Sequence, residues 1–512
     1  MRNTVSMMSK SQSDTVLARF SPATRRWFSG AFAAPTPVQQ AAWQAIVRGE
    51  HALVIAPTGS GKTLAAFLTA IDTLFQVRTS QPAPTRETTT RILYISPVKA
   101  LAADVQRNLN LPLAGVYAER QALNEPEITL NIGMRSGDTP NAERARLLRR
   151  PPDILITTPE SLFLMLTSKA RTTLKGVTTV IVDEVHAVAG SKRGSQLALS
   201  LERLDALLPK PAQRIGLSAT VRPVERIAAF LGGCQPVQVV NPAANRTLHL
   251  TIEVPVEDMT DIASADNLTD DVTSASGSIW PHIEARILQQ VMAHRATLVF
   301  VNSRGLAEKL TARLNARYLA QQATAEVQDA ERTVDDDLIA RSHHGSVSKE
   351  QRGEIEAALK QGRLRCVVAT SSLELGIDMG PVDLVVQVGS PLSVASALQR
   401  VGRAGHQVGG VSTGILFPRT RRDLLDSAVI IESMRAGQLD ALAPPRNPLD
   451  ILAQQTLAAV AMDPLQADEW YAQVCRADPF RTLSRRLFDA TLDMLAGKFP
   501  SDAFAQLRPQ LV

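Results

Sequence analysis

The glycine-rich segment at residues 56–63 constrains the fold more than any other feature of the sequence. It reads APTGSGKT, follows the apolar, β-branched run 51–56 and precedes a helical pattern that begins TLAAFL. Glycines let a backbone fold closely around phosphate oxygens, and a helix that starts at the same point adds a favourable dipole. This strand–loop–helix order predicts a phosphate-binding loop at the carboxyl edge of a parallel α/β sheet.

The residues of this loop take separate roles in a nucleotide site. Its backbone is expected to bind phosphate oxygens at Thr58, Gly59, Ser60 and Gly61. Lys62 would neutralise the β- and γ-phosphates, and the Thr63 hydroxyl would ligate Mg²⁺. The chain is therefore expected to bind ATP together with Mg²⁺.

An acidic pair follows the apolar run 177–182. Asp183, at the tip of the expected strand, can hold Mg²⁺ directly or through water, and Glu184 can polarise the attacking water. Acidic residues are common at strand ends, so the pair is informative because the phosphate-binding loop precedes it. Lys62, Asp183 and Glu184 are thus predicted to catalyse ATP hydrolysis.

Apolar runs alternate with helical patterns along most of the chain. One set lies at 51–56, 91–96, 153–158, 177–184 and 214–220, and a second set lies at 296–302, 365–371 and 382–389. Continuous apolar runs separated by helices are typical of parallel strands buried on both faces. After residue 437 three amphipathic stretches follow, which suggest a winged-helix module or, equally well, a plain helical packing unit. We expect α/β domains at 1–240 and 241–436 and an incomplete winged-helix-like domain at 437–512.

Composition and charge limit the expected binding partner and cellular compartment. The formal net charge of +5 weakly favours a polyanionic partner. Cys234, Cys366 and Cys475 lie far apart and match neither a disulfide framework nor a metal pattern, which fits a reducing compartment. The polar N-terminus lacks the apolar core of a secretory signal, and the sequence has no run of about 18 apolar residues. We therefore expect a cytoplasmic enzyme that does not cross a membrane.

Nine segments occur in the order of the motifs of superfamily-two helicases. They read APTGSGKT, SPVKALAADVQ, TTPESL, DEVH, SAT, VFVNSRG, HHGSVSKEQR, ATSSLELGIDMG and QRVGRAGH. The chain resembles the DExH subclass and, more closely, the bacterial Lhr (large helicase-related) family. The resemblance implies two tandem RecA-like domains followed by a partial winged-helix domain. It also implies an ATPase stimulated by single-stranded DNA that moves 3′ to 5′, unwinds duplexes and acts in DNA repair.

The same resemblance assigns further residues to the nucleotide. Gln39 would hydrogen-bond the adenine, and Gly376 and Asp378 would bind nucleotide or couple its state to the second domain. Arg403 resembles an arginine finger, and Gln399 and Arg400 would lie near the γ-phosphate. An arginine finger raises the rate of phosphoryl transfer by about 10³–10⁵-fold. Relatives often place another arginine where His406 stands, which leaves the role of that residue open.

Coupling and strand contact are also implied by the motifs. ATP would bridge the two domains, and His186, Ser218 and Thr220 would link its hydrolysis to strand movement. Backbone amides and hydroxyls at helix starts can bind phosphates without reading bases. The candidates for such contacts are Pro97, Lys99, Thr158, Glu160, Arg304, Thr370 and Ser371. Aromatic residues make up only 4% of the chain, so we expect little base stacking.

The expected partner is single-stranded DNA or tailed duplex DNA, with RNA possible, and the chain is expected to be monomeric. Two alternatives stay open: a DExH RNA helicase, and a fragment that binds nucleic acid with impaired turnover. Lhr-type proteins continue well beyond a winged helix, whereas this sequence stops at Val512. The simplest expectation is a truncated or split product that keeps the ATP site and engages the strand less well.

Overall fold

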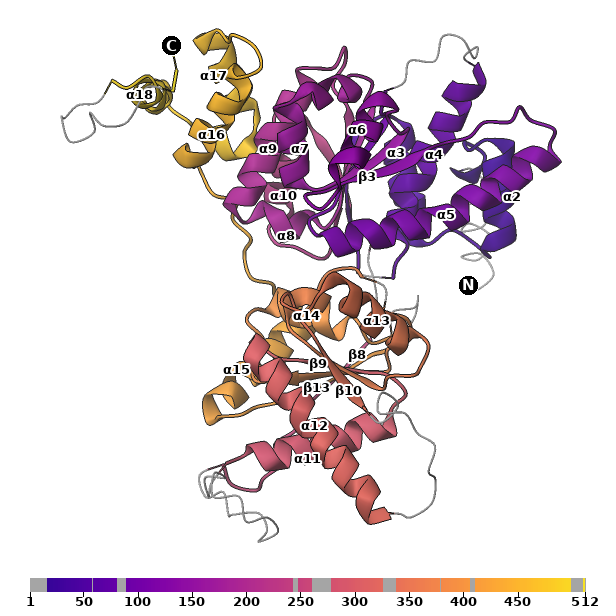
Figure 1. Ribbon diagram of the computed structural model, residues 1–512, viewed down its shortest axis with the longest axis vertical. Coiled ribbons are helices and arrows are strands. Elements are labelled where there is room, and N and C mark those ends of the chain that lie inside the picture. Colours follow the sequence, from indigo (N-terminus) through magenta and orange to yellow (C-terminus); the bar gives the residue numbers. More distant parts are fainter. Residues whose placement is uncertain are drawn as a thin grey trace, which may run out of the picture. The chain divides into compact units, whose positions relative to one another are not determined.

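The computed structural model describes residues 16–57, 59–80, 89–242, 247–259, 278–325, 338–377, 379–405, 410–498 and 510–511. The chain forms two compact units, each built around one parallel sheet (Figure 1). The first unit comprises Met1–Ala56, Ser60–Ala243 and Ala441–Val512, and the second comprises Pro57–Gly59 and Ala244–Asp440. Three residues that the sequence singles out, Thr58, Asp378 and His406, lie outside the described residues.

The first unit contains a seven-stranded sheet in the order β3-β4-β2-β5-β6-β1-β7. Its strands are β1 (His51–Ile55), β2 (Ile92–Ile95), β3 (Ile132–Arg135), β4 (Ile154–Thr157), β5 (Thr179–Val182), β6 (Gln213–Ser218) and β7 (Val237–Val240). All neighbouring strands pair in parallel, as the continuous apolar runs predict. The loops that follow the strands therefore gather at one carboxyl edge.

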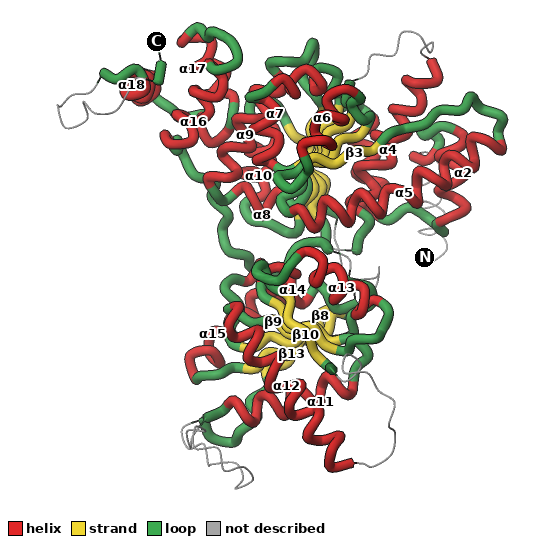
Figure 2. Tube along the Cα trace, viewed as in Figure 1, coloured by secondary structure: helices red, strands yellow, loops and turns green. Residues whose placement is uncertain are grey.

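Helices cover both faces of this sheet (Figures 1 and 2). One layer contains α3 (Pro37–Val47), α4 (Lys62–Ser80) and α5 (Lys99–Ala122), and the other contains α7 (Pro159–Leu166), α8 (Val185–Ala189), α9 (Lys192–Asp205) and α10 (Val224–Gly232). The unit also includes α2 (Pro22–Ala31), α6 (Asn141–Arg149) and the 3₁₀ helix η2 (Lys169–Leu174). Successive side chains of a strand point to opposite faces of the sheet and pack into the two apolar cores that lie there. In β1, Leu53 and Ile55 pack on one face, and Ala52 and Val54 pack on the other.

The C-terminal helices belong to the first unit. They are α16 (Leu449–Val460), α17 (Ala467–Arg476), the 3₁₀ helix η4 (Asp478–Phe480) and α18 (Arg485–Leu495). Leu452, Trp470 and Val474 are buried in the same apolar cluster as the inner face of α9. In the part of the chain that the structure describes, no strand follows residue 417. The expected helical character of the segment after residue 437 is therefore observed.

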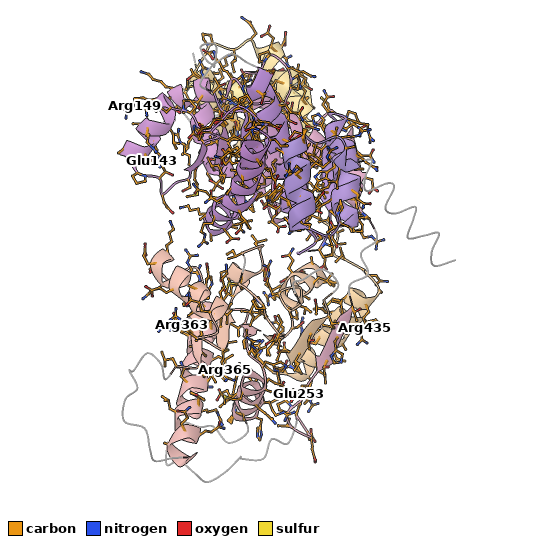
Figure 3. All side chains as sticks on the ribbon, turned by 90° about the vertical axis from the view of Figure 1, so that its right-hand side faces the viewer. Glu143, Arg149, Glu253, Arg363, Arg365 and Arg435 are labelled. Atoms are coloured by element: carbon orange, nitrogen blue, oxygen red, sulfur yellow. The ribbon has the colours of Figure 1, made fainter. Side chains whose placement is uncertain are left out.

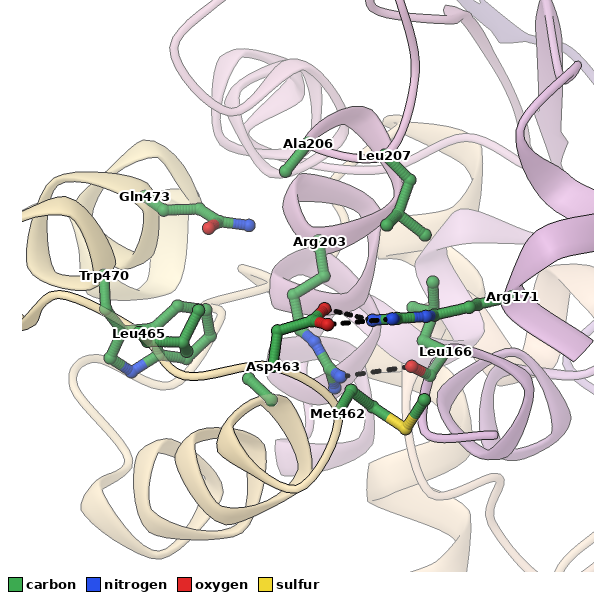
Figure 4. Close-up of a pocket in the computed structure, with 11 residues that line it drawn as sticks. Leu166, Arg171, Arg203, Ala206, Leu207, Met462, Asp463, Leu465, Trp470 and Gln473 are labelled. Carbon is green, nitrogen blue, oxygen red and sulfur yellow. Dashed lines mark hydrogen bonds and ion pairs between the residues drawn. The ribbon is translucent and has the colours of Figure 1, made fainter. Parts of the chain in front are cut away.

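Polar contacts also join α9 and η2 to these helices around a cavity of about 190 Å³ (Figure 4). Arg203 donates to the Gln455 side-chain oxygen at 2.8 Å and to the Ala458 carbonyl at 3.2 Å. Arg171 forms an ion pair with both oxygens of Asp463. Burial, together with the nearby Arg171, lowers the pKa of Arg203 to about 10.

The second unit contains a six-stranded parallel sheet in the order β10-β11-β9-β12-β13-β8. Its strands are β8 (Leu248–Ile252), β9 (Thr297–Phe300), β10 (Ala340–His343), β11 (Cys366–Ala369), β12 (Leu384–Val388) and β13 (Ser412–Phe417). Its helices are α11 (Trp280–Ala293), α12 (Arg304–Ala325), α13 (Lys349–Lys360), η3 (Ser371–Leu373), α14 (Val394–Val401) and α15 (Arg421–Arg435). Charged side chains such as Arg363 and Arg365, beside the start of β11, stay exposed (Figure 3).

The expected fold class, two parallel-sheet domains followed by a helical segment, is confirmed. Within the described part of the chain, no helix combines the length and the apolar composition needed to span a membrane.

A buried charge network ties α9 to β6 and α17. Glu202 on α9, only 2% exposed, lies 2.8 Å from the Arg214 guanidinium on β6 and 3.0 Å from Arg476 on α17. Asp205 contacts the same Arg214 at 2.7 Å. Such buried ions are costly to separate because the remaining charge stays desolvated.

We predict that Glu202→Ala lowers the free energy of unfolding of the first unit by about 3 kcal/mol, because Arg214 loses a buried partner. Urea denaturation followed by tryptophan fluorescence measures this loss. The exposed Glu469→Ala on α17 is the matched control and should change stability by less than about 0.5 kcal/mol. Equal stability of the two variants would contradict the structural role of the network.

Candidate nucleotide site and nucleic-acid interface

The phosphate-binding loop adopts the backbone that its glycines permit. Gly59 and Gly61 have φ angles of 79° and 86°, a region that residues with side chains rarely adopt. Helix α4 begins directly afterwards at Lys62, so the half-buried Thr63 lies in its first turn. The loop therefore ends at a helix N-terminus, which favours an anion.

The segment around Gln39 holds this loop from one side. The Thr36 hydroxyl donates to the Ser60 carbonyl at 3.0 Å, and the Gln39 side chain accepts from the Thr36 N–H at 2.9 Å. A Cβ atom on Gly61 would lie 2.6 Å from the Gln39 amide nitrogen. Gln39 is thus packed against the loop, where a residue that reads the base of a nucleotide is expected.

The Lys62 ammonium is fixed at the carboxyl edge of the sheet. It is 7% exposed and donates to the Ala56 carbonyl at 2.6 Å and to the Ser218 carbonyl at 3.1 Å. These carbonyls lie at the ends of the neighbouring strands β1 and β6. A buried cation is thereby placed directly beside the loop that is expected to hold phosphate.

Asp183 lies at the end of β5 and is fully enclosed. Its carboxylate accepts from the Glu184 N–H at 2.8 Å and from the hydroxyl of Tyr94. Burial and the neighbouring Glu184 raise the pKa of Asp183 to about 7, against the opposing effects of the Tyr94 hydrogen bond and the Lys62 charge. Tyr94 stacks on Phe67 with ring centroids 5.0 Å apart, and this contact helps to position the Tyr94 ring beside Asp183.

His186, two residues after Glu184, connects the acidic pair to the end of β6. Glu184 has a backbone φ of 44°. This conformation is strained for any residue other than glycine and costs about 1–3 kcal/mol. His186 Nδ1 accepts from the Ala219 N–H at 3.1 Å and lies 3.1 Å from the Ser218 hydroxyl. Burial lowers the pKa of His186. Because Nδ1 already accepts from the Ala219 N–H, the Ser218 hydroxyl is the donor in the second contact. Thr220 lies beyond this contact and is exposed.

The oxygen groups at this edge fit Mg²⁺, which prefers one or two carboxylates together with phosphate oxygens and water. Asp183 offers a carboxylate and Thr63 a hydroxyl, both at positions expected to face the phosphates. Among the described residues, no group of three or more His, Cys, Asp and Glu side chains is suited to hold a metal.

In the second unit, the two motif arginines are buried in hydrogen-bond networks. Arg400, 2% exposed, contacts Glu374 at 2.5 Å and Gln387 at 2.6 Å. Arg403, 3% exposed, donates to the Ile377 carbonyl at 3.1 Å and to the Glu374 carbonyl at 2.8 Å. The half-buried Gln399 and Gly376 lie in the two segments that these bonds join. The structure thus brings the segments 374–377 and 399–403 together.

The expected strand contacts of the first unit follow adjacent strands. Pro97 follows β2 and Thr158 follows β4, and these strands pair directly. Thr158 caps helix α7 by accepting from the Ser161 N–H at 3.4 Å. The exposed Lys99 forms an ion pair with Asp138 at 2.5 Å.

Glu160, in the first turn of α7, forms an ion pair with Arg193. Sequence reasoning missed both Arg193 and Tyr94. Tyr94 left a weak signal, a hydroxyl within an otherwise apolar strand, and Arg193 a weaker one, a cation at a helix start.

The expected strand contacts of the second unit also share an edge. The strands β9, β11 and β10 are neighbours, and Arg304, Thr370 and the segment after His343 follow them. The exposed Arg304 donates to the Ser346 hydroxyl at 3.0 Å. The Thr370 N–H donates to the His343 carbonyl at 3.4 Å, and the exposed Ser371 begins η3.

Known proteins resemble the chain over nearly its whole length. It is 63% identical over 511 residues to the Lhr helicase/uracil glycosylase of Escherichia coli (strain K12), covering 96% of this chain and 33% of that protein. It is 56% identical to the Lhr helicase/probable uracil glycosylase of Mycolicibacterium smegmatis, covering 97% of this chain and 33% of that protein. The structure of Mycobacterium smegmatis helicase Lhr bound to ssDNA and AMP-PNP matches with a TM-score of 0.85 and 55% identity, covering 96% of this chain and 59% of that chain.

The chain belongs to the Lhr (large helicase-related) family. Family models match three of its segments: DEAD/DEAH box helicase at residues 36–227, helicase conserved C-terminal domain at 283–407, and the winged helix domain of the large helicase-related protein at 432–512. The family predicted from the motifs is therefore confirmed. This Lhr chain spans about a third of the length of the two curated relatives.

The pKa of Asp183 leads to a prediction about the stability of this Lhr chain. An acid whose pKa rises from 3.8 to about 7 on folding destabilises the fold increasingly as pH rises across that range. Asp183→Asn removes the buried charge and keeps one side-chain oxygen, which can accept from either the Tyr94 hydroxyl or the Glu184 N–H. We expect it to raise the melting temperature at pH 8 by on the order of 3 °C, with the gain fading towards pH 4.

Calorimetry at several pH values measures this change. The exposed Asp493→Asn is the matched control and should show no comparable dependence on pH. A gain for Asp183→Asn that is equal at pH 4 and pH 8, or a loss at pH 8, would contradict the burial of a costly charge.

Proposed function

We propose that this chain is an ATP-dependent DNA helicase or translocase. The observation that carries the proposal is the convergence of Lys62, Asp183 and His186 at one carboxyl edge, with the phosphate-binding loop beside them. Lys62 supplies a cation for phosphate and Asp183 a carboxylate for Mg²⁺, two of the parts that hydrolysis of a nucleoside triphosphate uses. His186 joins them to Ser218 at the end of β6. Membership in a family of ATP-dependent helicases supports the same reaction.

The residues of the chain take the following parts in hydrolysis. Lys62 exchanges its two carbonyl partners for β- and γ-phosphate oxygens, and Gln39 binds the base. Glu184 accepts a hydrogen bond from the attacking water and orients it in line with the γ-phosphate. When bound, Mg²⁺ neutralises phosphate charge, and Asp183 and Thr63 hold it. Arg403 is proposed to stabilise the charge of the transferring phosphoryl group, with Gln399 and Arg400 supporting it.

We propose that the strand is single-stranded DNA or the tail of a duplex, gripped through its backbone by the loops at the carboxyl edges of both sheets. The related helicase Lhr of Mycobacterium smegmatis, whose structure is described as bound to ssDNA and AMP-PNP, supports this choice. Stimulation by single strands, movement from 3′ to 5′ and a part in DNA repair follow from the family resemblance. An RNA strand is the alternative that the first test separates.

That test compares ATP hydrolysis and strand separation on duplexes with 3′ or 5′ tails of DNA or RNA. We expect the largest stimulation and unwinding with a 3′ DNA tail. Greater stimulation by RNA tails would replace the DNA assignment with an RNA helicase. Binding without stimulated turnover on every substrate would favour the alternative of a nucleic-acid-binding fragment.

We predict that Lys62→Ala and Glu184→Gln each lower DNA-stimulated ATP hydrolysis by about 10²-fold or more, because each removes a group that acts on the phosphates or the water. Steady-state phosphate release measures the rates, and circular dichroism checks the fold. Lys175→Ala, at an exposed lysine of the same unit, is the matched control and should hydrolyse ATP normally. Full stimulated turnover in both site variants would rule out the proposed reaction centre.

A further inference from the structure

Arg193, the second residue of α9, joins two loops at the carboxyl edge of the first unit. Its guanidinium donates to the Pro97 carbonyl at 2.7 Å and to one Glu160 oxygen at 3.1 Å, and its Nε bonds the other Glu160 oxygen. Pro97 follows β2 and Glu160 follows β4, which are neighbouring strands. A single side chain thus joins the loop after β2 to the first turn of α7, two segments that are expected to grip the nucleic-acid strand in this unit.

The position of Arg193 is not explained by the stability of its own helix. The amide groups at a helix start favour negative charge, yet α9 begins with Lys192 and Arg193 and has no acidic residue in its first turn. The unfavourable placement is offset by the two-pronged contact with Glu160. Such a fork fixes the orientation of both partners as well as their distance.

The Glu160 carboxylate lies at a helix start that is expected to bind a phosphate of the strand. It lies in the first turn of α7, directly after the Thr158 cap, where an unpaired carboxylate would repel a phosphate. Burial alone would raise the pKa of Glu160, but hydrogen bonds and charge from Arg193 hold it below its ordinary value. Glu160 therefore remains ionised, and its charge is neutralised by Arg193 before any strand arrives.

Arg193 is also connected to the nucleotide site through α8. That helix starts directly after Glu184 and contains His186. The Ser191 N–H donates to the Val188 carbonyl at 3.1 Å, and a Cβ atom on Gly194 would lie 2.3 Å from the same carbonyl. The start of α9 is therefore packed tightly on the end of α8, the helix that follows Glu184.

We propose that Arg193 is a positioning residue that holds the loop at Pro97 and the start of α7 at Glu160 in the geometry that grips a nucleic-acid strand, without contacting phosphate itself. In this assignment Glu160 anchors Arg193 and is not a strand contact. The inference rests on the proposed function, because it presupposes that these loops bind nucleic acid.

The test measures binding of the full chain to a fluorescein-labelled oligo-dT strand by anisotropy, at several salt concentrations between 50 and 200 mM. We expect Arg193→Ala to weaken binding by about 2- to 30-fold, the range found for residues that act through others. The slope of log affinity against log salt should stay as in the unsubstituted chain, because no phosphate contact is lost. Glu160→Gln combined with Arg193→Ala should bind no more weakly than Arg193→Ala alone.

Lys192→Ala is the matched control, because it removes the same charge one residue away. Its partner is Asp450 on α16, at 2.7 Å, and not a strand-binding loop. We expect this variant to bind oligo-dT like the unsubstituted chain, and melting temperatures measured alongside should be similar for both variants.

Three results would overturn the positioning role. Equal affinities of Arg193→Ala and Lys192→Ala would show that the bridge is irrelevant, and a slope reduced by about 0.7 would reveal a direct phosphate contact. A melting temperature that falls in step with the affinity would make Arg193 merely structural. If the unsubstituted chain itself fails to bind oligo-dT, the proposed function fails and the inference fails with it.

Discussion

The structure depends on a buried ammonium held beside a buried acidic pair at the carboxyl edge of a parallel sheet. Lys62 is bonded to the carbonyls of Ala56 and Ser218, and Asp183 is enclosed next to Glu184. Desolvation makes each of these charges costly alone, and the hydrogen bonds to each group and the attraction between Lys62 and Asp183 offset part of that cost. In the proposed reaction, phosphate and Mg²⁺ would relieve both costs at once.

Local chemistry makes the backbone of the phosphate-binding loop predictable from the sequence. The glycines at 59 and 61 permit the positive φ angles that the loop needs, and the apolar runs predict the strands. The two parallel sheets and the family are confirmed. Tyr94 and Arg193 escaped prediction because their roles arise from contacts between segments 89 and 96 residues apart along the chain. The roles of the individual site residues stay predictions.

The C-terminal helices illustrate a different limit of sequence reasoning. Amphipathic spacing shows that a helix buries one face, but it does not show what covers that face. The sequence predicts a winged-helix-like domain at 437–512, and in the structure Trp470 and Val474 pack into the core on one side of the first sheet. Glu202 reinforces this junction by contacting Arg214 on β6, the strand that leads to Ser218. The helical segment is thereby attached to the same strand that carries part of the nucleotide site.

The most direct measurement is a structure of the chain crystallised with AMP-PNP, Mg²⁺ and a short DNA strand. We expect the Lys62 ammonium to leave the Ala56 and Ser218 carbonyls and to lie within hydrogen-bond distance of the β- and γ-phosphates. We also expect Mg²⁺ to be bound near the Asp183 carboxylate. A nucleotide bound elsewhere, with Lys62 still bonded to both carbonyls, would contradict the central claim.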